Sequence, residues 1–141
     1  MMLRSQGMIV SSLLVAMTLS GCQSTKSGGS GGLFSRKPPA SATYIGALQG
    51  GIIGRSGVEL SDSDRQRALE AEYRALEGAG VGQPVVWSGR NVSGKVVAAA
   101  PYQVGSQNCR QYTHSVTIDG KETVARGSAC RNDNGSWSPL G

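Results

Sequence analysis

The sequence is poor in the residues that most enzyme and metal sites require. Its 141 residues include one histidine, one phenylalanine and three cysteines. Leucine, isoleucine, valine and phenylalanine together make up about 20% of the chain, which is low for a protein with an ordinary core. This excludes a large enzyme with a deep apolar pocket and argues against any site that needs two histidines. The HExxH and P-loop patterns are also absent, so we expect no catalytic residue, no metal site and no cofactor.

The first 21 residues have the layout of a secretory signal peptide. Arg4 precedes an apolar run from Met8 to Leu19, and small residues follow this run. A transmembrane helix is the alternative. A helix of that length spans about 18 Å, whereas the hydrocarbon core of a bilayer is about 30 Å thick. The run is therefore too short to cross a membrane, and we expect export. An exported chain with a net charge of only +5 is not expected to bind nucleic acid.

The residues at the end of this leader match the lipobox of bacterial lipoproteins. Leu19-Ser20-Gly21-Cys22 fits that pattern at all four positions. The resemblance implies that Cys22 becomes the first mature residue and carries acyl chains, which anchor a protein in a membrane. Ordinary cleavage that leaves a free thiol is the alternative. Gln23 follows instead of the Asp that retains lipoproteins in the inner membrane of the best-known bacteria. We therefore expect lipid anchoring in the outer membrane, facing either the periplasm or the cell surface.

Two glycine-rich segments follow the anchor. Residues 22–43 are dominated by Gly, Ser and Pro, and this composition predicts a disordered linker. Residues 44–58 form a short segment in which Gly46, Gly50 and Gly54 recur at intervals of four. On a helix these glycines would share one face, as in a membrane-surface or self-associating element. A glycine-rich loop is the alternative, because each glycine inside a helix is disfavoured by about 1 kcal/mol.

An amphipathic helix is predicted over residues 59–78. Ser61 and Asp64 have the spacing of a capping box, and Gly78 is a typical helix end. An apolar stripe follows the helical period at Leu69, Tyr73 and Leu76. The acidic residues are interpreted as a solvated helix face rather than a catalytic pair: Glu70, Glu72 and Glu77.

The β-rich region, residues 79–141, contains a hairpin signal that also predicts a disulfide. Asp119-Gly120 separates two strand-like runs and is typical of a two-residue type I′ turn. The resulting ladder places Cys109 opposite Cys130, an odd number of steps from the turn, at a non-hydrogen-bonded pair where side chains lie close. A three-residue turn would shift this register by one. Metal binding by the two cysteines is the other alternative, although the spacing resembles no zinc site.

The same ladder assigns the faces of the hairpin. Alternation places Tyr112, His114, Val116 and Ile118 on one face, which we expect to be the core face. His114 is interpreted as a hydrogen-bonded structural residue rather than a general base. The fold class is therefore α+β. One amphipathic helix precedes a small antiparallel sheet, a meander or partial barrel, stapled by one disulfide and preceded by a disordered N-terminal tether.

Several short motifs of the C-terminal half recur in one known family. They are Cys109-Arg110-Gln111-Tyr112, Ile118-Asp119-Gly120-Lys121, Ala125 through Cys130-Arg131, and Asn134-Gly135-Ser136-Trp137. In this order they resemble the rickettsial 17 kDa surface antigen family of glycine-zipper outer-membrane lipoproteins. The resemblance covers about residues 59–139 and includes the lipobox. It implies a compact disulfide-bearing β domain and an outer-membrane location, and it brings no catalytic residues. Long glycine-zipper stretches are usual in that family, whereas only residues 44–58 remain here.

The expected function is a structural or contact role in the cell envelope, without catalysis. The partner would be the membrane through Cys22, together with an envelope protein or peptidoglycan; the oligomeric state is not predicted. The alternative is a binding or inhibitor module for an acidic glycan or protein, because the β-rich region is basic. Its basic residues are Arg90, Lys95, Arg110, Lys121, Arg126 and Arg131. We prefer the simpler interpretation that this basic region meets the acidic helix of the same chain.

Overall fold

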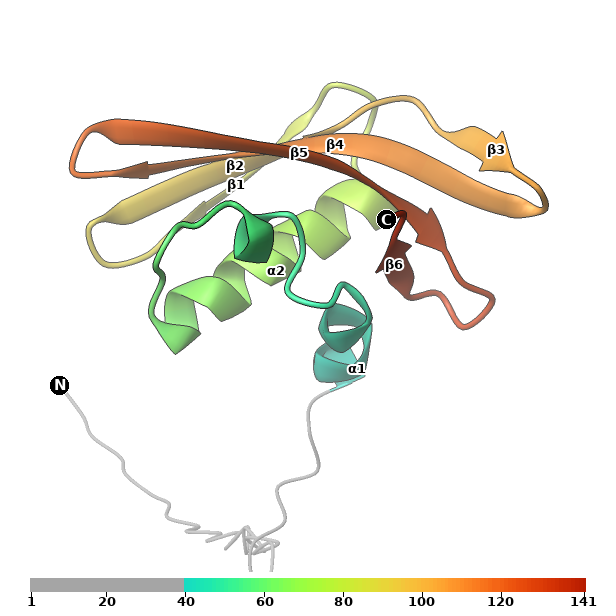
Figure 1. Cartoon of the computed structure of the whole chain (residues 1–141), viewed down its shortest axis with the longest axis horizontal. Coiled ribbons are helices and arrows are strands. Elements are labelled where there is room, and N and C mark those ends of the chain that lie inside the picture. Colours follow the sequence, from blue (N-terminus) through green and yellow to red (C-terminus); the bar gives the residue numbers. More distant parts are fainter. Residues whose placement is uncertain (1–39) are drawn as a thin grey trace, which may run out of the picture. The chain divides into compact units, whose positions relative to one another are not determined.

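Helices cover one face of an antiparallel six-stranded sheet in the computed structural model, which describes residues 40–141 (Figure 1). The signal peptide, Cys22 and most of the expected linker lie outside the described residues. The helical elements are α1 (Ala40–Ala47), the 3₁₀ turn η1 (Ile53–Arg55) and α2 (Asp62–Glu77). The strands are β1 (Pro84–Ser88), β2 (Val92–Ala98), β3 (Tyr102–Val104), β4 (Gln107–Ile118), β5 (Lys121–Arg131) and β6 (Trp137–Pro139). No helix within residues 40–141 is long and apolar enough to cross a membrane.

Helix α2 lies within the predicted range 59–78, and it begins and ends at the cap residues that the sequence predicts. The Ser61 hydroxyl accepts a hydrogen bond from the Asp64 backbone N–H (3.2 Å), which satisfies one of the free donors at the helix start. The Ser61 hydroxyl also donates to the Asp64 carboxylate (2.8 Å). Gly78 follows the last helical residue, and its backbone N–H binds the Arg74 carbonyl (3.1 Å). Local capping chemistry therefore fixes both ends of the longest helix.

The sheet is open and follows a meander with one interruption. The strand order is β1-β2-β4-β5-β6, and the short strand β3 pairs with one end of β4. Strands β2 and β3 contact the same edge of β4 end to end, because β2 pairs with residues 112–118 and β3 with residues 107–109. The expected antiparallel sheet is confirmed in its open, meander form. Strand β3 was not anticipated.

The β4–β5 hairpin has the predicted register. Asp119 and Gly120 both have positive φ (49° and 77°), as a type I′ turn requires. Ile118 faces Lys121, and Cys109 faces Cys130 at the far end of the ladder. The two cysteines form a disulfide, and their Cα atoms are 4.0 Å apart. This short separation fits a non-hydrogen-bonded pair, so the two-residue turn and the cross-strand staple are both confirmed.

The core lies between the sheet and the helical layer. Side chains of even-numbered residues in β2 and β4 point towards α2, while their neighbours form the outer face of the sheet. The buried strand residues include Trp87, Val92, Val96, Tyr112, His114, Val116 and Trp137. Two glycines permit close packing in this layer. A side chain at Gly94 would overlap the Trp87 indole, and one at Gly127 would overlap Ile52.

The segment before α2 is part of this core. Helix α1 begins at Ala40, inside the expected linker, and it ends at Ala47, where the chain turns at Gly50 and Gly51 with positive φ. Gly46, Gly50 and Gly54 therefore do not share one helix face, and that interpretation of the spacing is wrong. The apolar residues between them are buried in the domain: Ile45, Leu48, Ile52 and Ile53. They pack inside this chain instead of forming a membrane-surface element.

Candidate functional site

A fully buried carboxylate lies at the centre of the domain. Glu72 on α2 is 0% exposed and accepts four hydrogen bonds. The backbone N–H groups of Ile52 and Ile53 donate to its two oxygens at 3.1 and 3.0 Å. The Tyr112 hydroxyl donates at 3.0 Å, and His114 Nδ1 lies 2.8 Å away. Each carboxylate oxygen thus has two partners, which offsets the unfavourable burial of a charge.

The hydrogen bonds assign one tautomer to His114. The Trp87 indole N–H can only donate, and it binds His114 Nε2 at 2.8 Å. Nε2 must therefore be the unprotonated nitrogen, and the proton lies on Nδ1, where it is donated to Glu72. A neutral imidazole with both nitrogens bound and 0% exposure has no free position for a substrate proton. His114 is a structural residue, as the sequence indicates.

Tyr112 is held in its protonated form by the same environment. Burial raises the pKa of Tyr112 above its ordinary value, and the nearby Glu72 carboxylate raises it further. A protonated hydroxyl is the form that donates to Glu72. The phenol is therefore fixed as a donor and is not available as a general base.

The glycine before Ile52 makes the carboxylate site possible. Gly51 has φ +62°, which disfavours any other residue, and a side chain there would overlap the Glu72 carboxylate. The turn can therefore bring two successive N–H groups onto one carboxylate only with glycine at this position. Glu72 thus joins the N-terminal segment, α2 and the sheet.

A second buried charge, that of Arg110, lies at the C-terminal end of α2. The Arg110 guanidinium donates from Nη1 to the carbonyls of Ala75, Leu76 and Ala79 at 3.0–3.1 Å, and from Nε to Ala99 at 2.8 Å. Carbonyls in the last turn of a helix lack partners within the helix and carry partial negative charge. Arg110 satisfies them from β4, so it fixes the end of α2 to the sheet.

The third polar contact lies at the edge of the domain. Glu77 accepts two hydrogen bonds from Arg131 (3.0 and 2.9 Å) and one from the Trp137 indole N–H (2.7 Å). The hydrogen bond from Arg131 holds the pKa of Glu77 below its ordinary value of 4.5, and the bond from Trp137 adds to this, although partial burial acts the other way. Glu77 thereby joins α2 to β5 and β6.

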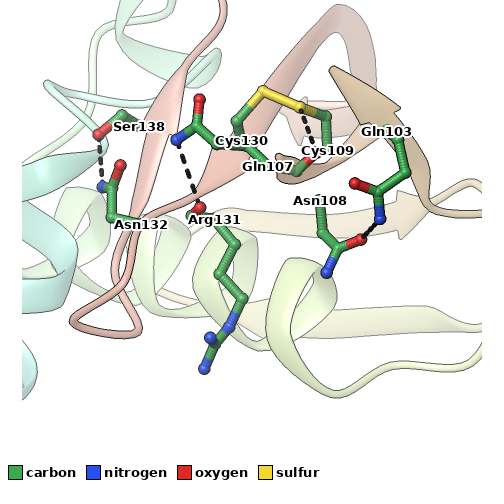
Figure 2. Close-up of a disulfide and its surroundings, with 8 residues drawn as sticks. All are labelled: Gln103, Gln107, Asn108, Cys109, Cys130, Arg131, Asn132 and Ser138. Carbon is green, nitrogen blue, oxygen red and sulfur yellow. Dashed lines mark hydrogen bonds between the residues drawn. A yellow bond between two sulfur atoms is a disulfide. The ribbon is translucent and has the colours of Figure 1, made fainter. Parts of the chain in front are cut away.

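The disulfide lies among polar side chains at the β3 end of the sheet (Figure 2). Gln103 on β3 donates to Asn108 on β4, and Gln107 donates to the Arg131 carbonyl on β5. Next to the bridge, the Asn132 amide donates to Ser138 on β6 at 2.8 Å. The staple therefore lies where four strands converge and holds the C-terminal strands in place.

The structure corrects the interpretation of the acidic helix. Glu72 was expected on a solvated face, and it is the most buried acid of the chain's described part. The helical period could have revealed this, because Glu72 is three residues after Leu69 and four before Leu76, within the apolar stripe. The expected contact between the basic region and the helix is present in part. Arg110 and Arg131 contact α2, whereas Arg90, Lys95, Lys121 and Arg126 are exposed.

These contacts define a structural centre. Among residues 40–141 no group of three or more His, Cys, Asp or Glu side chains could hold a metal ion. A groove of about 750 Å³ lies between the start of α2 and the β1–β2 turn. Glu72 and His114 are inaccessible to a substrate. Cys22 lies outside the described residues, so lipidation there stays a prediction.

The fold and its buried contacts define a small disulfide-stapled α+β domain whose strongest polar interactions hold its elements together. The family model of the 17 kDa outer membrane surface antigen matches residues 74–138. A 17 kDa surface antigen of Rickettsia bellii (strain RML369-C) is 33% identical over 157 residues, covering 92% of this chain and 94% of the relative. This chain therefore belongs to the 17 kDa surface antigen family.

Other relatives match over about half of this chain and about half of their own length. The 17 kDa surface antigen of Rickettsia conorii (strain ATCC VR-613 / Malish 7) is 37% identical over 81 residues, which are 55% of this chain and 51% of the relative. That of Rickettsia prowazekii (strain Madrid E) is 36% identical over 80 residues, or 54% and 50%. No solved structure gives a significant match. The family implies a surface or outer-membrane location and is named for an antigen, not for a catalytic activity.

The motifs that carried the family resemblance now have physical roles. The Cys-Arg-x-Tyr motif supplies half of the disulfide, the Arg110 contact with α2 and the Tyr112 bond to Glu72. Asp119-Gly120 forms the hairpin turn. Arg131 and Trp137 both bind Glu77. The motifs therefore describe how this domain is assembled.

Proposed function

We propose that this protein is a lipid-anchored outer-membrane lipoprotein with a non-catalytic structural or contact role in the cell envelope. The observation that carries the proposal is the combination of a lipobox ending at Cys22 with a stapled domain of an outer-membrane antigen family. The most polar buried groups of the domain, Glu72 and Arg110, are fully used in holding it together. A structural or contact role requires only a lipid anchor and a stable domain attached to it.

Replacement of the lipidation residue tests this proposal. Cys22→Ser removes the thiol that would carry acyl chains, so we expect the full-length protein to leave the membrane fraction and become soluble. Ser24→Ala is the matched control, because it changes a neighbouring residue and keeps the lipobox. Membrane association of Cys22→Ser equal to that of the control would contradict lipid anchoring. Fractionation of cells followed by immunoblotting provides the measurement.

A second candidate function is binding of an acidic envelope ligand such as peptidoglycan. It is favoured by the exposure of Arg90, Lys95, Lys121 and Arg126, none of which forms an ion pair within residues 40–141. Such binding would weaken with added salt, because exposed charges are screened beyond about 10 Å at 0.1 M ionic strength. Co-sedimentation with purified peptidoglycan at low and high salt measures it. Equal recovery at both salt concentrations, or none at low salt, would exclude this candidate.

A further inference from the structure

Strand β5 has a long free edge. One side of β5 pairs with β4 along its whole length, whereas β6 pairs with the other side only at Ala129–Arg131. Figure 1 shows β6 beside one end of β5. The bond from Leu140 N–H to the Ser128 carbonyl (2.9 Å) is the last backbone hydrogen bond on that side of β5 among the described residues. Within the part of the chain that the structure describes, no element pairs with the outer edge of β5 from Lys121 to Gly127.

The ladder shows which backbone groups face outward along this edge. Ile118 and Lys121 flank the two-residue turn and form a hydrogen-bonded pair, and the pairs then alternate. Glu122, Val124 and Arg126 therefore direct their N–H and C=O groups away from β4. The same alternation places the Ser128 carbonyl on the outer side, where Leu140 indeed binds it. Three alternate residues thus offer unpaired donors and acceptors along one edge.

The side chains of these three residues are complementary to those of the same three residues in an antiparallel second copy. Glu122, Val124 and Arg126 all lie on the outer face of the sheet and are exposed, and Val124 is 47% exposed. An antiparallel second β5 centred on Val124 places each Glu122 opposite Arg126 of the second copy. It also places the two Val124 side chains opposite each other. Opposite charges and apolar pairs across strands stabilise a sheet, whereas like charges destabilise it.

We propose that β5 is a dimerisation edge, on which a second copy of this chain adds its own β5 antiparallel with Val124 at the twofold axis. Hydrogen bonding restricts an antiparallel copy to registers that differ by steps of two residues, and charge selects this one among them. Residues with outward backbone groups must face one another, and this register pairs Glu122, Val124 and Arg126 with Arg126, Val124 and Glu122. A shift by two residues separates the charges, and a parallel arrangement brings like charges together. The resulting contact is isologous, as in most closed dimers.

The opposite edge of the sheet lacks these properties. In β1 the bond from Gly89 N–H to the Val92 carbonyl sets the alternation, so Pro84, Val86 and Ser88 face outward. This edge is also shorter, because β1 has 5 residues and β5 has 11. Pro84 has no N–H to donate, and none of the three residues is charged, so the β1 edge has no complementary charge pair. Charges on an edge strand often prevent association. The pair on β5 differs because its opposite signs, four residues apart on one face, match in an antiparallel copy.

Cysteine cross-linking in membranes of cells producing the full-length chain tests the proposal. Val124→Cys places two thiols opposite each other at the proposed axis, so mild oxidation should give a disulfide-linked dimer on a non-reducing gel. Val86→Cys is the matched control, because it is also an exposed outer-face valine on an edge strand, 68% exposed. We expect the cross-link for Val124→Cys beyond the level of wild type and Val86→Cys. Equal yields for the two variants, or a cross-link to a different protein, would overturn the proposal.

Charge variants test the register separately. In the Val124→Cys background, Glu122→Arg opposes two arginines to each other, and Arg126→Glu opposes two glutamates, so each variant alone should lose the cross-link. Co-production of the two variants with tags of different size restores opposite charges and should restore a mixed dimer. Both residues are exposed and bind no other side chain within the described residues, so the melting temperature should be unchanged. Retention of the cross-link in both single variants, or its absence on co-production, would refute this register.

Discussion

Single residues in this domain act as connectors between elements that are distant in the sequence. Glu72 joins the Ile52–Ile53 turn, α2 and the sheet through four hydrogen bonds, and a buried charge left without such partners is strongly destabilising. The charge is tolerated because a glycine turn, a phenol and a neutral imidazole all donate to it. We therefore regard Glu72 as the residue on which the arrangement of the core depends most.

Replacing Glu72 with glutamine tests this view. The substitution keeps the size of the side chain but turns one acceptor oxygen into a donor group, so two of the four donors lose their acceptor. We expect a loss of about 3 kcal/mol in the free energy of unfolding, measured by urea denaturation. Glu70→Gln on the same helix is the control, because Glu70 bonds only to the exposed Gln66. An equal effect of both substitutions would show that the buried network contributes little.

Glu77 makes the stability of the domain depend on pH in the acid range. Its pKa is lower in the folded state than the ordinary value, chiefly because Arg131 donates to it. The stabilisation by Glu77 is therefore complete above its unfolded pKa and is lost as the pH falls through its folded pKa. Glu77→Gln should be less stable than wild type near neutral pH and equally stable in strong acid. Melting temperatures across this range measure the difference, and a gap that widens on acidification would contradict the assignment.

At the scale of elements, the disulfide holds the far end of the β4–β5 hairpin. The disulfide lies next to the three-residue strands β3 and β6, whereas the hairpin turn lies at the other end of the ladder. Short strands contribute few hydrogen bonds, so the covalent link restrains the part of the sheet with the least pairing. A domain with so few large apolar residues gains more from such a link than a larger one.

Removing the disulfide should destabilise the domain measurably. The double variant Cys109→Ser/Cys130→Ser removes a cross-link between residues 21 positions apart. For a loop of this length the chain-entropy model gives a loss of about 3 kcal/mol in the free energy of unfolding. Thermal unfolding of wild type with and without reductant provides the comparison. Reductant should lower the melting temperature of wild type and leave that of the double variant unchanged. An unchanged melting temperature on mutation would remove the staple from the account.

The hairpin could be predicted from the sequence because its signal is local. Asp119-Gly120 fixes the turn, the turn fixes the register, and the register brings Cys109 to Cys130 without knowledge of the rest of the chain. The capping of α2 by Ser61 was readable for the same reason. The place of Glu72 within the apolar stripe was a local signal of burial that was missed, whereas its hydrogen-bond partners lie 19 to 42 residues away and could not be predicted locally. The packing of Ile52 against Gly127 likewise follows from tertiary contacts and has no local signature.

At the scale of the whole molecule, the sequence predicts export and a membrane anchor, and the structure shows a domain stapled by a disulfide. The C-terminal motifs that carry the family resemblance make contacts that hold the domain together. The outer face of the sheet and the free edge of β5 are among the exposed parts of the described domain that are open for contact. The proposed structural or contact role in the envelope depends on two covalent features, the predicted acylation at Cys22 and the Cys109–Cys130 bond.

One measurement tests both features together: the intact mass of the protein extracted from membranes, before and after reduction. The account predicts a chain that begins at Cys22, carries the mass of acyl chains and gains about 2 Da on reduction, since a disulfide takes up two hydrogens. A chain without lipid would contradict the anchored lipoprotein. A mass unchanged by reduction would contradict the stapled domain.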